Sequence, residues 1–127
     1  MPIACNLDDI RDRGCREFSF HEGDEKRFGF LVRVGQTVWA YRNACPHLLI
    51  SMNWLRDHFL DHREEHIQCA LHGALFEIDT GLCVTGPCFG RYLQSIPVVV
   101  IDRRIELPMP VSLESSIAWG EKPSICD

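Results

Sequence analysis

The chain has 127 residues, of which 46% are hydrophobic and 24% charged, and its formal net charge is -5 at pH 7. This length supports one globular domain, and the acidic balance with only two lysines argues against a nucleic-acid partner, because phosphate binding needs clustered Lys and Arg. No apolar run is long enough to span a membrane and no signal peptide is readable, so we expect a cytoplasmic protein.

Cysteine is unusually frequent, with 7 residues in this short chain. In a reducing compartment such a density indicates metal or redox chemistry more often than disulfides, and an odd number cannot pair completely within one chain.

The first regular elements are β-strands. Residues 15–20, 28–34 and 37–42 are rich in aromatic and β-branched side chains, and Gly35-Gln36 fits a tight hairpin turn between the last two. These segments predict the start of an antiparallel meander.

Two further strands are expected within residues 93–109, turned at Asp102-Arg103-Arg104, with 98–101 as a buried run. Strands near both ends of the chain would then build a base sheet. After Glu106, the prolines and the lack of alternation predict a tail that packs along the body or frays.

Residues 43–90 are rich in Gly, Pro, Cys and His, which favours loops carried on the β-scaffold. Cys45 and His47 form one pair in "CPH", and Cys69 and His72 form a second in "CALH". Each pair offers one thiolate and one imidazole from a short loop. Two such loops side by side would bind tetrahedral zinc or an iron-sulfur cluster.

The second pair continues as "CALHGALFEIDTGLCVTGPCFGRYLQSIPVVV", and together with "CPH" this pattern resembles the Rieske family. The resemblance implies an all-β fold, with an antiparallel base sheet and a small, loop-rich cluster-binding subdomain at about 43–90. It implies a Rieske domain over 1–106, a C-terminal tail over 107–127, and a [2Fe-2S] cluster. Cys45 and Cys69 would bind the inner iron, and His47 and His72 the outer iron.

The resemblance also indicates a branch of the family. High-potential members carry an extra cysteine in each ligand loop and hydroxyl groups that donate to the cluster sulfurs. The matching positions are apolar here: Ile50, Leu71, Ala74 and Phe76. This chain looks like the soluble ferredoxins, with a potential on the order of -150 mV. Such carriers are not catalysts; they pass single electrons from a flavoprotein reductase to the oxygenase of a dioxygenase system.

Two other functions stay open on the sequence. The chain could be an accessory Rieske subunit of a larger oxidoreductase complex, or a structural zinc-binding module. The insertion at 50–66 lies beside the expected docking face, whose apolar contacts would be Leu48, Leu49, Leu71 and Pro87. It also holds His58, His62 and His66, which would line one face of a helix as a second metal site. A strand at His66 and solvated loop histidines are the favoured alternative.

Residues 81–88 contain two further features, a group of turn-forming residues and a pair of cysteines. Gly81, Gly86 and Pro87 are expected to shape a turn that approaches the cluster closely. Cys83 and Cys88 could donate weak hydrogen bonds, act as redox-active thiols, or behave as small buried apolar groups, and the last is favoured.

Overall fold

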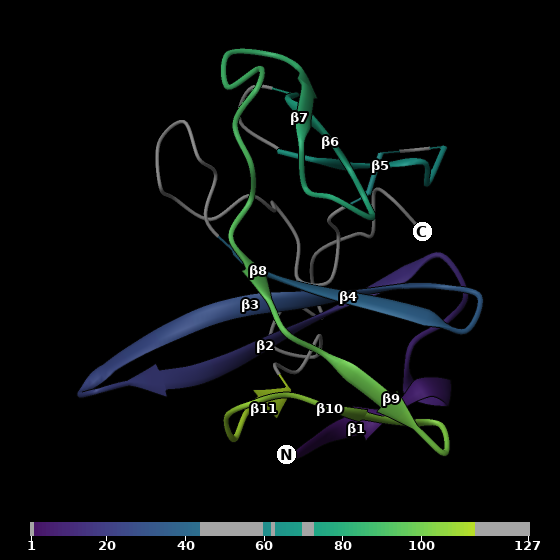
Figure 1. The fold of residues 1–127 in the computed structure, drawn as a ribbon, viewed down its shortest axis with the longest axis vertical. Coiled ribbons are helices and arrows are strands. Elements are labelled where there is room, and N and C mark those ends of the chain that lie inside the picture. The colour runs from purple at the N-terminus through teal and green to yellow at the C-terminus, as the bar shows by residue number, and fades with distance from the viewer. Residues whose placement is uncertain (1, 44–59, 62, 70–72, 114–127) are drawn as a thin grey trace, which may run out of the picture.

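The computed structural model describes residues 2–43, 60–61, 63–69 and 73–113, and within them the fold is almost entirely antiparallel β-structure, as predicted (Figure 1). The strands form a five-stranded sheet in the order β11-β2-β3-β4-β8, a three-stranded sheet β1-β10-β9, and a three-stranded sheet β5-β6-β7. Their bounds are β1 Ile3–Asn6, β2 Gly14–Glu22, β3 Glu25–Val34, β4 Thr37–Arg42, β5 His66–Gln68, β6 Leu75–Glu77, β7 Cys83–Thr85, β8 Ser95–Ile96, β9 Val99–Ile101, β10 Arg104–Glu106 and β11 Ser112–Leu113.

The β2–β3–β4 meander confirms the three strands predicted in the first third of the chain. β2 pairs with β3 from Gly14↔Arg33 to Glu22↔Glu25 without a bulge. The β3–β4 turn is at Gly35-Gln36 as expected, and Gly35 has a φ of 63°, which glycine adopts without steric cost.

The predicted hairpin near the other end is also present, as β9 and β10. Its turn residues Asp102 and Arg103 have φ values of 50° and 62°, the left-handed geometry of a tight two-residue turn. This hairpin pairs with β1, a strand that was not predicted, through a register that begins at Ile3↔Glu106.

The predicted burial of residues 98–101 is wrong. Val99 is 41% exposed and Ile101 45% exposed, and Val98 and Val100 are only partly covered. The reason is topological: β9 is the edge strand of its sheet, so the apolar run is not enclosed between two neighbours.

Two hydrophobic cores lie on opposite faces of the meander, because successive side chains of a strand point to opposite faces. The core between the meander and the β1-β10-β9 sheet, called the lower core, contains Leu31 of β3 with Leu7 and Ile105. The core on the other face, called the upper core, contains Phe30 and Val32 of β3 with side chains of the β5-β6-β7 region. The meander is therefore the shared wall between the two cores.

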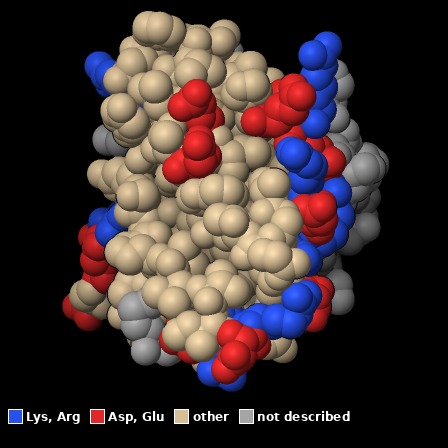
Figure 2. Space-filling view, turned by 45° about the vertical axis from the view of Figure 1, so that its right-hand side comes forward, with Lys and Arg blue, Asp and Glu red and all other residues tan. Residues whose placement is uncertain are grey.

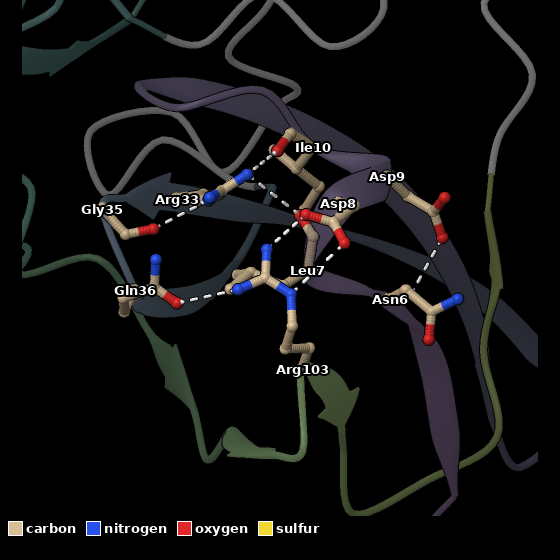
Figure 3. Close-up of polar contacts among 9 residues, drawn as sticks. All are labelled: Asn6, Leu7, Asp8, Asp9, Ile10, Arg33, Gly35, Gln36 and Arg103. Atoms are coloured by element: carbon tan, nitrogen blue, oxygen red, sulfur yellow. Dashed lines mark hydrogen bonds and ion pairs between the residues drawn. The ribbon is translucent and has the colours of Figure 1, made fainter.

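Arginine side chains fasten the 3-10 helix Leu7–Asp9 to this framework (Figure 3). Arg33 donates from Nη1 to the Ile10 carbonyl at 2.7 Å and from Nε to the Gly35 carbonyl at 2.8 Å. Arg103 forms an ion pair with Asp8. These contacts link the 3-10 helix and the residue after it to strand β3 and to the β9–β10 turn.

The segment after Glu106 continues along the body. Leu107 is fully buried and its N–H donates to the Pro2 carbonyl at 3.0 Å, and Ser112 and Leu113 of β11 pair with β2. Residues 107–113 thus add a strand that the sequence did not indicate. In the part of the chain that the structure describes, no helix is long and apolar enough to cross a membrane.

Candidate metal centre

Of the four predicted ligands, the structure describes Cys69, while Cys45, His47 and His72 lie outside the described residues. The first ligand loop leaves the meander after Asn43. The Asn43 N–H donates to the Phe28 carbonyl at 2.9 Å, and its side-chain amide donates to Glu17 at 2.8 Å within the core. Two hydrogen bonds therefore fix Asn43, the residue at which the first predicted ligand loop begins, at the end of β4.

Cys69 directly follows β5, at the start of the second ligand loop. Its N–H donates to the Ala74 carbonyl at 2.9 Å, and its carbonyl accepts from the Gly73 N–H at 2.8 Å. Gly73 has a φ of 67°, the left-handed conformation that this return of the chain requires. These bonds bring the two ends of the loop together, and Cys69 lies at its base.

The surroundings of Cys69 are apolar. Cys69 has no exposed surface, and Ile67, Ala74 and Phe76 of the same core are also fully buried. A thiolate in such a place is costly without a cation beside it, so the predicted role of Cys69 as a ligand requires the metal to lie directly against its sulfur.

A glycine turn lies against the same segment. Gly86 has a φ of 112°, and a Cβ on it would lie 2.8 Å from the Ala74 Cα. Gly81, with a φ of 76°, would place a Cβ 2.9 Å from the Tyr41 ring. Both glycines allow a close approach of two segments, Gly86 to Ala74 and Gly81 to Tyr41. The predicted approach to the cluster stays a prediction.

Tyr41 of β4 connects the meander to the β5-β6-β7 sheet. Its hydroxyl donates to the Ile78 carbonyl at 2.6 Å in a buried position. Burial, with the nearby Asp79 carboxylate, raises the pKa of Tyr41 to about 12, so the phenol keeps its proton and this bond at all ordinary pH values.

The other predicted site residues are placed as follows. His66 is in β5, so a helix does not run through it, and the favoured strand interpretation is confirmed; His58 and His62 lie outside the described residues. Leu48, Leu49 and Leu71 also lie outside them, whereas Pro87 is exposed. Among the described residues, no group of three or more His, Cys, Asp or Glu side chains could hold a metal ion.

Two exposed aromatic side chains near Pro87 were missed. Phe89 is 73% exposed and Tyr92 is 60% exposed, and nothing in their sequence context distinguished them from core residues. Figure 2 shows a face on which Lys and Arg lie along the margins, uncharged residues cover most of the centre, and Asp and Glu side chains stand among them in its upper part. That distribution suits a protein partner better than a polyphosphate.

The donor set fits the cluster that the resemblance implied. Two thiols and two imidazoles are the ligands of a Rieske cluster, and the one predicted ligand that the structure describes is the buried thiol of Cys69. Ala74 and Phe76 add no hydroxyl donor beside it.

Comparison with known proteins is consistent with this geometry. The family model for the Rieske [2Fe-2S] domain matches residues 3–101. No curated protein sequence matches the chain.

Several solved structures share the fold. One is a chain from the complex of reduced oxygenase and oxidized ferredoxin in carbazole 1,9a-dioxygenase, at 21% identity and a TM-score of 0.64, covering 84% of this chain and 99% of that one. A second is the ferredoxin of carbazole 1,9a-dioxygenase from Nocardioides aromaticivorans IC177, at 22% identity and a TM-score of 0.64, covering 86% and 97%. A third is a putative NADH-dependent nitrite reductase small subunit from Mycobacterium tuberculosis, at 22% identity and a TM-score of 0.57, covering 82% and 89%.

The family match extends over most of the chain, and it spans both segments that carry the four predicted ligands. It confirms the predicted fold and the predicted cofactor, a [2Fe-2S] cluster. The chain belongs to the Rieske [2Fe-2S] domain family.

Proposed function

We propose that the protein is a soluble, cytoplasmic one-electron carrier that passes electrons from a flavoprotein reductase to an oxygenase-type partner. The observation that carries this proposal is the family match over residues 3–101, joined to a fold that spans almost the full length of a dioxygenase ferredoxin. The bound cluster supplies the chemistry, since it accepts and releases a single electron.

The proposal assigns the cluster ligands by residue. Cys45 and Cys69 hold the inner iron, and His47 and His72 hold the outer iron. Residues 43–90 act as the cluster-binding subdomain of a domain that spans 1–106. What supports this assignment is the resemblance of both pairs to the Rieske ligand pattern and the buried thiol of Cys69.

The chain's own residues set the properties of the carrier. The apolar Ala74 and Phe76 withhold hydroxyl donors that would stabilise the more negative reduced state. We therefore expect a reduction potential near the low end of the Rieske range, on the order of -150 mV.

The first test is low-temperature EPR of the dithionite-reduced protein, with iron and acid-labile sulfide counted on the same sample. A Rieske-type signal with about two irons and two sulfides per chain supports the carrier. An EPR-silent sample with one zinc per chain would instead make the protein a zinc-binding module.

The ligand assignment has its own test. His47→Cys and His72→Cys each add a negative charge at the outer iron, so either variant that still assembles a cluster is expected to lower the potential by on the order of 100 mV. His21→Cys, on the exposed part of β2, is the matched control and should leave the potential unchanged. A potential that stays the same in His47→Cys or His72→Cys removes that residue from the ligand set.

A second candidate function is an accessory Rieske subunit of a larger oxidoreductase. The fold shared with the small subunit of a putative nitrite reductase favours it, at nearly full length of that chain. The size of the native protein in a lysate, measured by gel filtration and immunodetection, separates the two. Elution at the monomer mass supports the free carrier, whereas stable elution with a much larger protein supports the subunit.

A further inference from the structure

Two cysteines outside the proposed ligand set lie side by side in the upper core. The Sγ atoms of Cys83, in β7, and Cys88, in the turn that follows, are 3.0 Å apart. The Cys88 thiol donates to the Cys83 sulfur, and the Cys83 thiol donates to the Thr85 carbonyl at 3.3 Å. Each residue is only 1% exposed.

The backbone holds this pair in place. Cys83 exchanges hydrogen bonds with the returning chain, since its N–H donates to the Arg91 carbonyl at 2.8 Å and its carbonyl accepts from the Gly90 N–H at 3.0 Å. The Arg91 N–H also donates to the Cys88 carbonyl at 2.9 Å. The two thiols are therefore brought together by a closed turn and not by chance side-chain rotation.

We propose that Cys83 and Cys88 form a reversible, redox-active dithiol pair. An S–S bond is about 2.05 Å long, so the two sulfurs need to approach by roughly 1 Å. With a low-molecular-weight disulfide as oxidant, the two protein thiols become one disulfide and the oxidant becomes two thiols. Two electrons and two protons pass from the protein to the oxidant, and excess thiol reverses the reaction.

Access to the pair is through the turn. Cys88 is buried, but Thr85, Gly86, Pro87, Phe89 and Gly90 around it are all exposed. Local opening of this short turn is enough to present the Cys88 thiol to solvent, without unfolding of the meander. Cysteine pairs that serve as redox sensors in reducing compartments are of this transient kind.

The oxidised pair would lock the turn that lies against Ala74. Gly86 is between the two cysteines and approaches Ala74 so closely that a Cβ would lie 2.8 Å from the Ala74 Cα. A disulfide across Gly86 fixes that contact in place. The dithiol pair itself does not depend on which residues bind the cluster.

The experiment treats the full-length protein with glutathione disulfide, blocks remaining thiols at low pH, and digests it with trypsin and a glutamyl endopeptidase. Cleavage after Glu77 and Arg91 releases residues 78–91, in which Cys83 and Cys88 are the only cysteines. We expect this peptide to lose the mass of two hydrogen atoms and to take up two blocking groups again after dithiothreitol.

Single variants make the result specific. In Cys88→Ser the peptide should show no loss of two hydrogens and should carry glutathione on Cys83 or a blocked thiol. Cys5→Ser removes a buried thiol of the lower core and is the matched control, so its 78–91 peptide should oxidise as in the parent. The proposal would be overturned if both thiols still reacted with the blocking reagent at every ratio of glutathione disulfide to glutathione. It would also be overturned if this peptide formed disulfides only to other cysteines.

Discussion

The Tyr41 hydroxyl links strand β4 to the turn after β6, through its 2.6 Å hydrogen bond to the Ile78 carbonyl. Tyr41→Phe leaves that buried carbonyl without this donor, and we expect a loss of about 1–2 kcal/mol in the free energy of unfolding. Tyr92→Phe is the control, because Tyr92 is 60% exposed, and it should change stability by less than about 0.5 kcal/mol. Urea unfolding followed by circular dichroism measures both; equal effects would contradict the role given to Tyr41.

Gly86 and Gly90 provide a second comparison at the residue scale. Both have positive φ values, 112° and 87°, but a Cβ would meet Ala74 only at Gly86, and nothing lies within 4 Å at Gly90. Gly86→Ala should therefore weaken cluster retention, read from visible absorbance after gel filtration, while Gly90→Ala has only the backbone strain of about 1 kcal/mol. Equal retention in the two variants would show that the turn does not support the ligand loop.

At the scale of the strands, Ile105 and Ile101 separate the core of a sheet from its edge. Ile105 in β10 has no exposed surface, whereas Ile101 in β9 is 45% exposed. Ile105→Ala is expected to reduce the free energy of unfolding by about 2–5 kcal/mol, and Ile101→Ala by less than about 1 kcal/mol. Thermal unfolding of the two variants is the measurement, and a large loss in Ile101→Ala would mean that β9 is covered in solution.

Sequence patterns predicted the long strands well, because alternation and turn chemistry are local. The β2–β3–β4 meander and the turn at Asp102-Arg103 follow from such signals. Strand β6 was missed, since its three residues carry too little pattern to stand out from a loop. The error over 98–101 arose because an apolar run does not tell whether its strand is central or at an edge.

The candidate site shows the same limit. Residue type, spacing and the family resemblance led to the four predicted ligands, and these stay a prediction. Cys69, the one that the structure describes, is a buried residue directly after β5. The contact between Gly86 and Ala74 and the 3.0 Å approach of Cys83 to Cys88 depend on how three short strands pack together. No local pattern encodes that packing, so neither contact could be predicted.

For the whole molecule, two exposed carboxylates make the free energy of unfolding depend on pH. The Arg103 guanidinium donates to Asp8 and holds the pKa of that carboxyl below its usual 3.8, and the Gly35 N–H similarly lowers the pKa of Asp12. A lowered pKa in the folded state means that the unfolded chain binds protons first as pH falls. Their stabilising contribution is present above about pH 4 and is lost below it.

The expected result is a urea midpoint that falls as the pH is lowered through about 4, and a shallower fall in Asp8→Asn. That variant removes one of the titrating groups while its amide can still accept from Arg103. A pH dependence identical to that of the parent would show that the Asp8–Arg103 pair of Figure 3 does not contribute in solution.

The pairing of Ile3 with Glu106 has a practical consequence for attaching the protein to other molecules. The two strands lie at the end of the molecule opposite the β5-β6-β7 sheet (Figure 1). A surface linker or a fused protein joined before Pro2 would therefore extend away from Cys69. An electrode that captures the chain by this end would leave the β5-β6-β7 sheet facing the solution, where a diffusing redox partner can reach it.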